Sequence, residues 1–229
     1  MFREVRRVFE PVVDAVRRRQ WYRFALGPAA TLTVVALSLA FRTKAGHAFI
    51  NAYAVTRPGD DWFTSAIKLP LSMFAPAALL PFWFAIVQVG VVYALAQALL
   101  GWRTTLIVAV AGHTLATLSA SVWIAIGLPF GVAPRFWHFG DAGPSVAVIA
   151  LLAYIAVNRR VSWLAIALIG YHGIEMATFN GLSQREHLVG AVVGAAGAAG
   201  VRLWHAAGLG ERLAARERQL TETLSRSGA

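Results

Sequence analysis

The sequence predicts an all-α membrane protein whose core is a bundle of six transmembrane helices. Of its 229 residues, 58% are hydrophobic and only 14% are charged, and the mean hydropathy is +0.59. Soluble domains are nearer a quarter charged. The apolar residues gather in long runs, and the lysines and arginines cluster between those runs. This pattern indicates helices that cross a bilayer, with basic residues that set their orientation.

Residues 1–23 precede the first apolar run and form a basic, amphipathic segment. Valines and Phe9 recur at helical spacing along it, and seven arginines lie between them. This composition predicts a helix that lies in the membrane interface. The first apolar run lacks a small-residue cleavage site, so we expect it to be retained as an anchor and not removed as a signal peptide.

Six apolar runs follow the basic segment and define a transmembrane domain over residues 24–205. A loop at 42–70 separates the first two runs, and its aromatic residues indicate that it lies against the membrane. Residues 206–229 form a charged tail, expected to be a short solvated helix or disordered. The expected spans are 24–41, 74–100, 104–128, 145–157, 161–179 and 186–201.

The basic residues between the spans predict the topology. With a cytoplasmic N-terminus, fifteen lysines and arginines lie on the inner side and six on the outer side. An inner excess of this kind is typical of plasma and bacterial inner membrane proteins. Both termini are then cytoplasmic, and the fourth and sixth spans run in the same direction. The six outer residues are Arg42, Lys44, Arg57, Lys68, Arg135 and Arg185.

The fourth and sixth spans place a serine and a histidine at one depth in the membrane. Fourteen residues separate Ser145 from Arg159, a helical rise of about 21 Å, and fifteen separate His187 from Arg202, about 22 Å. A bilayer core is about 30 Å thick. If the arginines lie at the inner surface, Ser145 and His187 both lie beneath the outer one.

Small residues predict that these two spans touch. Glycines recur along the sixth span at 190, 194, 197 and 200, and alanines lie between them. Such patterns let another helix approach closely. The fourth span begins with Gly143, Ala147 and Ala150, so contact between the two spans would bring Ser145 next to His187. An imidazole that accepts the serine proton would make that serine a nucleophile.

The chain resembles the rhomboid intramembrane proteases at these residues. That family has a six-helix core, a Gly-x-Ser at the start of the fourth helix and a His-x-x-Gly-x-x-x-Gly on the sixth. Here the elements are Gly143-Pro144-Ser145 and His187 followed by Gly190 and Gly194. The resemblance covers about residues 24–205. It implies a Ser145–His187 dyad that cleaves transmembrane helices unwinding near the outer face, without a cofactor.

The chain departs from the rhomboid pattern at several positions. Counting back from Gly101, the family's second-helix histidine and asparagine, which help to bind the oxyanion, fall at Pro81 and Ala85, and its glutamate falls at Gln97. Val146 follows the serine where the family has glycine or alanine, and Ile149 stands at the position of a tyrosine. The alternative is therefore an inactive rhomboid-like protein that binds the transmembrane helices of client proteins.

Other interpretations of these residues stay open. Ser145 also fits a helix cap, and His187 fits an interfacial histidine beside Arg185 and Glu186. Asp141 lies four residues before Ser145, where a carboxylate would orient His187 or remain in an exposed loop. The sequence holds no cysteine, which excludes disulfides and thiolate metal sites.

Polar residues inside the other spans point to a third class of function. His172 and Glu175 lie three residues apart in the fifth span, and His113 lies in the third. Intramembrane ionisable residues are costly and mark sites or buried pairs. His113, His172 and Glu175 would suit a transporter or a metal-handling protein. A local pair between His172 and Glu175 is the simpler interpretation, so we expect no metal site. The basic residues lack the aromatic-studded face typical of nucleic-acid binding.

Overall fold

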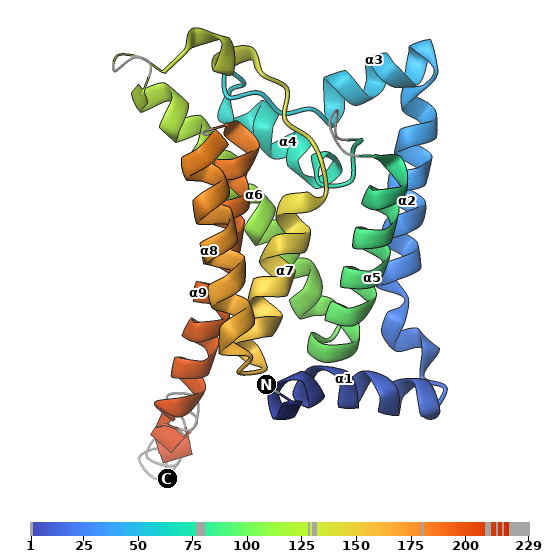
Figure 1. Ribbon diagram of the computed structural model, residues 1–229, viewed down its shortest axis with the longest axis vertical. Helices are drawn as coiled ribbons and strands as arrows, with labels where there is room; N and C mark the ends of the chain where they lie inside the picture. The colour runs from blue at the N-terminus through green and yellow to red at the C-terminus, as the bar shows by residue number, and fades with distance from the viewer. Residues whose placement is uncertain are drawn as a thin grey trace, which may run out of the picture.

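The computed structural model describes residues 2–76, 81–127, 129, 132–179 and 181–208, and residues 212, 213, 215, 216, 218 and 219 of the tail. In this part of the chain the regular structure is helical, apart from one isolated bridge between Thr56 and Asp141. Figure 1 shows the elements in chain order. They are α1 (Phe2–Arg17), η1 (Trp21–Phe24), α2 (Leu26–Phe41), α3 (Lys44–Tyr53), α4 (Trp62–Ser72), α5 (Phe82–Leu100), α6 (Trp102–Gly127), η3 (Pro134–His138), α7 (Ser145–Asn158), α8 (Ser162–Phe179) and α9 (Leu182–Ala206).

Three of the described helices are long and apolar enough to cross a membrane. These are α5, α6 and α9, with 19, 26 and 25 residues. Helices α2 and α7 are apolar but shorter, and α8 carries His172 and Glu175. The structure therefore agrees with an all-α protein in a lipid bilayer environment. The count of six spans and the rhomboid arrangement remain predictions.

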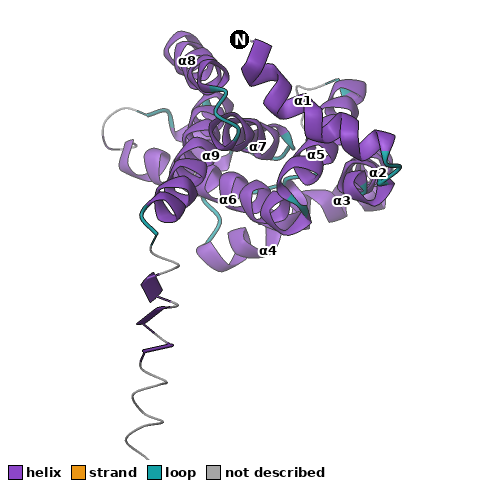
Figure 2. Cartoon of the chain, turned by 90° about the horizontal axis from the view of Figure 1, so that it is seen from below, coloured by secondary structure: helices purple, strands orange, loops and turns teal. Residues whose placement is uncertain are grey.

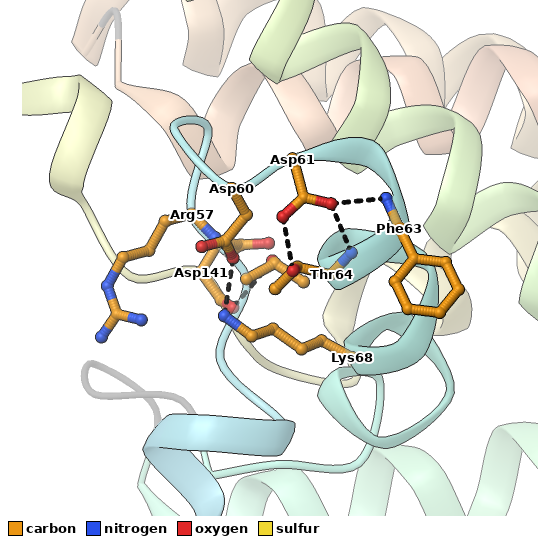
Figure 3. Close-up of polar contacts among 8 residues, drawn as sticks. Arg57, Asp60, Asp61, Phe63, Thr64, Lys68 and Asp141 are labelled. Carbon is orange, nitrogen blue, oxygen red and sulfur yellow. Dashed lines mark hydrogen bonds and ion pairs between the residues drawn. The ribbon is translucent and has the colours of Figure 1, made fainter.

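The expected loop at 42–70 is largely helical. Thr43 caps α3, where its side-chain oxygen accepts a hydrogen bond from the Gly46 N–H at 3.0 Å. Asp61 caps α4 and accepts hydrogen bonds from the N–H groups of Phe63 and Thr64, each at 3.0 Å (Figure 3). Caps of this kind satisfy N–H groups that a helix start leaves unpaired, so the polar turn residues start helices here.

Helix α7 is the central element of the bundle. It packs against α5, α6, α8 and α9, which surround it when the molecule is seen along the helices (Figure 2). Ten of its 14 residues are buried. This burial explains why the α7 sequence is apolar around its whole circumference.

Glycines allow the close approach of α7 to its neighbours. A Cβ atom on Gly190 would lie 3.0 Å from Val146 Cγ1, and one on Gly194 would lie 2.9 Å from the Ala150 carbonyl carbon. A Cβ on Gly112 of α6 would overlap the Ala150 side chain from the other side. The predicted contact between the fourth and sixth spans is therefore confirmed, and it forms at the predicted glycines.

Arginines from η1, α9 and the end of α7 gather where α5 and α7 end. Arg23 donates a hydrogen bond to the Ala98 carbonyl at 2.8 Å, Arg159 to that of Leu99 at 2.6 Å, and Arg202 to that of Val157 at 3.1 Å. Cations at helix C-termini satisfy free carbonyls and complement the helix dipole. Helix α1 crosses the bundle at this same end (Figure 1) and buries Val8 and Ala15. Helix α1 and these arginines therefore lie together at one end of the bundle.

A candidate serine–histidine site

A short, tightly held turn places Ser145 at the first position of α7. Gly143 has a φ of 142°, which glycine adopts far more readily than other residues. Its N–H donates to the Ser72 carbonyl at 2.9 Å. Just before it, Asp141 and Thr56 exchange two backbone hydrogen bonds of 2.9 and 2.8 Å. The chain that leads to Ser145 is therefore fixed to α4 and to the segment after α3.

His113 supports this turn from α6. It is only 1% exposed, and its Nε2 lies 2.7 Å from the Ser72 hydroxyl oxygen. That hydroxyl donates its one hydrogen to the Leu69 carbonyl at 3.0 Å, so we assign Nε2 of His113 as the donor in the pair. His113 is thus a structural residue beside Ser72, and the structure does not bring it to His172 and Glu175.

Ser145 and His187 lie within hydrogen-bonding distance of each other. The Ser145 hydroxyl oxygen is 2.8 Å from Nε2 of His187, which lies in the second turn of α9. Both helices begin on the same side of the molecule and run side by side from there (Figure 1). Ser145 and His187 meet because α7 and α9 begin on the same side of the molecule and because Gly190 and Gly194 let the two helices pack closely.

A carboxylate lies on the other side of the His187 ring. Nδ1 of His187 is buried and has no hydrogen-bond partner among the described residues. The nearest carboxylate oxygen, Oε2 of Glu175, is 3.8 Å away. The same oxygen accepts a hydrogen bond from Nδ1 of His172 at 2.8 Å, which confirms the predicted local pair in α8. The order serine, imidazole, carboxylate is the arrangement in which a histidine becomes a base.

Asp141 does not orient His187. Its side chain shares a hydrogen bond with Glu186, which is 2% exposed. Two carboxyl groups can share a hydrogen bond only while one of them keeps its proton. Burial raises the pKa of Asp141 to about 6, and hydrogen bonds from Glu186 and from the Ala142 N–H oppose that shift. Asp141 therefore ties the turn before Ser145 to the start of α9.

Glu175 and Glu186 are the two residues of this site that the sequence did not reveal. The sequence indicated Glu175 as the partner of His172, or as part of a group with His113 and His172, but gave no sign that it lies beside His187. In the sequence, Glu186 is one of several polar residues at a helix start. Its position directly before His187 was the one signal that it would lie near the site.

The positions that correspond to rhomboid oxyanion donors offer no side-chain donor here. Pro81 is exposed at the start of α5, and Ala85 is buried and lines a cavity of about 430 Å³ that also reaches Gly140 and Ala142. Ile149 packs in an apolar cluster with Ala153 and residues of α8 and α9. The donors that remain are backbone N–H groups in the first turn of α7, which a helix leaves without intrahelical partners.

One further ion pair lies in the segment that leads into α4. Asp60 pairs with Lys68 at 2.7 Å, and the Lys68 side chain is 8% exposed. Figure 3 shows this pair and Asp141 in one close-up. Because Asp60 also accepts the Arg57 N–H at 2.9 Å, its carboxylate closes a turn and is not free to act on His187.

Comparison of the chain with family models, with curated proteins and with solved structures finds no significant match.

Proposed function

We propose that this chain is a rhomboid-like intramembrane serine protease that cleaves transmembrane helices. The observation that carries the proposal is the 2.8 Å contact between the Ser145 hydroxyl and Nε2 of His187, formed by two adjacent apolar helices. A serine that only caps a helix needs no imidazole beside it, and a histidine that only lies at the membrane interface needs no serine partner. A serine nucleophile and its general base have to lie within hydrogen-bonding distance, as these two side chains do.

In the proposed reaction, Ser145 Oγ attacks the carbonyl carbon of the scissile peptide while its proton passes to Nε2 of His187. Backbone N–H groups in the first turn of α7 stabilise the oxyanion, and the carboxylate of Glu175 stabilises the imidazolium. The C–N bond then breaks as His187 returns the proton to the leaving amine. Water, activated by His187, hydrolyses the acyl-enzyme and restores Ser145.

The proposed arrangement in the membrane is six spans with both termini on the cytoplasmic side of a plasma or inner membrane. The inner side then holds the arginines that cap α5 and α7, and Ser145 lies beneath the outer surface. The substrate is a transmembrane helix that unwinds beside the outer third of the bilayer. No cofactor takes part in these steps.

A second candidate is an inactive rhomboid-like protein that binds the transmembrane helices of client proteins. Pro81 and Ala85 favour it, because neither supplies a side-chain donor to an oxyanion. Loss of one such donor typically costs about 100- to 1,000-fold in turnover. Binding of a client helix needs the fold but no oxyanion donor.

Reconstitution separates the two candidates. The full chain is incorporated into vesicles with a panel of transmembrane segments that carry helix-destabilising residues in their outer third. Cleavage that Ser145→Ala and His187→Ala abolish supports the protease, provided that Ser162→Ala, which alters an exposed serine at the start of α8, leaves it unchanged. Photo-crosslinking of the segments without any cleavage favours the client-binding protein and overturns the protease.

A further inference from the structure

Helices α8 and α9 bring together three side chains with the chemistry of metal ligands. One ligand atom from each of His172, Glu175 and His187 lies within 4.8 Å of the other two. The Glu175 oxygen is 2.8 Å from His172 and 3.8 Å from His187. Two imidazoles and one carboxylate form the ligand set of many catalytic zinc sites.

The spacing of these atoms is close to what a zinc ion requires. Zinc binds histidine nitrogen at about 2.0–2.1 Å and carboxylate oxygen at about 2.0–2.2 Å in tetrahedral geometry, which separates ligand atoms by about 3.4 Å. The three atoms approach that spacing before any ion binds. Small rotations of the side chains would complete it.

The state of His187 is a second, independent indication of a ligand. Its Nδ1 is buried without a hydrogen-bond partner among the described residues, and it lies 3.8 Å from the Glu175 oxygen that also contacts His172. A buried polar nitrogen without a partner loses hydration and gains nothing in return. A metal ion among the three side chains would supply the missing partner.

We propose that His172, Glu175 and His187 form a zinc-binding site that switches off Ser145. This inference deepens the proposed protease function and rests on it. A neutral imidazole that binds a metal through Nδ1 carries its proton on Nε2. Nε2 of His187 then donates a hydrogen bond to the Ser145 oxygen and has no lone pair to accept the serine proton. Without the ion, Nδ1 carries the proton toward Glu175, and Nε2 is free to act as the base.

The site is accessible to an ion without opening of the bundle. The side chains of Glu175 and His187 are 20% and 18% exposed, whereas that of His172 is 8% exposed. Glu175 lies four residues before the end of α8. We therefore expect zinc to reach the site from the side on which Ser145 lies.

Equilibrium binding of Zn²⁺ to the metal-free full chain in detergent tests the site directly. We expect one tightly bound Zn²⁺ per chain, and about 100-fold weaker binding or more in His172→Ala, because removal of a direct ligand exceeds the 10- to 100-fold effect of second-shell changes. His205→Ala is the matched control, since it removes an exposed histidine near the far end of α9. No bound ion in folded protein, or equal affinity in His172→Ala, would overturn the site.

The effect of zinc on Ser145 is measured separately, as the rate of labelling by a fluorophosphonate with and without Zn²⁺. We expect zinc to slow labelling at least about tenfold in the wild-type chain and in His205→Ala, and the ratio to return to one in His172→Ala. Tight zinc binding with unchanged labelling would refute the switch. If the chain binds zinc but Ser145 never reacts with the fluorophosphonate, the metal site is supported and the proposed protease function is refuted.

Discussion

Replacement of Gly194 by alanine should push α9 away from α7. A Cβ atom at this position would lie 2.9 Å from the carbonyl carbon of Ala150 and 3.0 Å from its Cα. Carbon atoms in contact are normally about 3.5–4.0 Å apart, so the helices must separate by about 0.5–1 Å. The atoms that resist belong to a backbone buried on all sides, and no rotamer change relieves the clash.

The cost of this separation follows from overpacking in a filled core. Overpacking typically costs about 1–3 kcal/mol, and we expect the upper part of that range because backbone atoms are involved. Gly200→Ala is the matched control, since no atom lies within 4 Å of a Cβ at that position. Both substitutions gain up to about 1 kcal/mol from helix propensity, so this gain cancels and the difference between the variants is the cost of overpacking.

Thermal unfolding in detergent, followed by the fluorescence of the eight tryptophans, measures the difference between the two variants. A gap of about 2–3 kcal/mol corresponds to roughly 4–12 °C in Tm for a chain of this size, with Gly194→Ala the less stable. Equal Tm values for Gly194→Ala and Gly200→Ala would refute the close packing of α7 on α9.

Three further predictions concern the surroundings of Ser145. Burial raises the pKa of Asp141 from 3.8 to about 6, so the stability that its protonated carboxyl contributes is present below about pH 4 and is lost as the pH rises through 6. Unfolding titrations should show this loss in the wild-type chain and a smaller one in Asp141→Asn, and identical pH profiles would contradict the carboxyl pair. Ser72→Ala should destabilise the fold by about 1–3 kcal/mol because it leaves the buried His113 unpaired, and an unchanged Tm would show that this contact is dispensable. A cysteine at position 145, in a chain that has no other, should react with a polar thiol reagent added from outside the cell, and labelling from the cytoplasmic side alone would reverse the proposed topology.

The sequence predicted the features that depend on one helix or on one pair of helices. Hydropathy placed the apolar helices to within a few residues for α7 and α8, and the glycines at 190 and 194 identified the contact between α7 and α9. The similar distances from Ser145 and His187 to the arginines that follow them, fourteen and fifteen residues, predicted that the two side chains lie at the same level, and they lie 2.8 Å apart. These are properties of helical rise and of side-chain size, which can be read from the sequence directly.

The carboxylates were harder to predict because their partners depend on how helices are rotated about their axes. Asp141 was the nearest acidic residue to Ser145 in sequence, yet its side chain contacts Glu186, and Glu175 of α8 faces His187 instead. Helix α8 runs opposite to α7 and α9, so distance arithmetic along parallel spans does not apply to it. The helices α3 and α4 were missed for a local reason, because Thr43 and Asp61 act as caps where the pattern indicated turns.

The central claim is that His187 activates Ser145, and covalent labelling by a fluorophosphonate tests it most directly. Metal-free, detergent-purified chain is treated with the reagent, and the modified peptide is identified by mass spectrometry. We predict a single adduct on Ser145 that Ser145→Ala removes, that His187→Ala slows by a factor of at least about 100, and that Ser162→Ala leaves unchanged. A folded chain that forms no adduct at Ser145, or one that labels equally well without His187, would contradict the claim and leave Ser145 as the first residue of a buried helix.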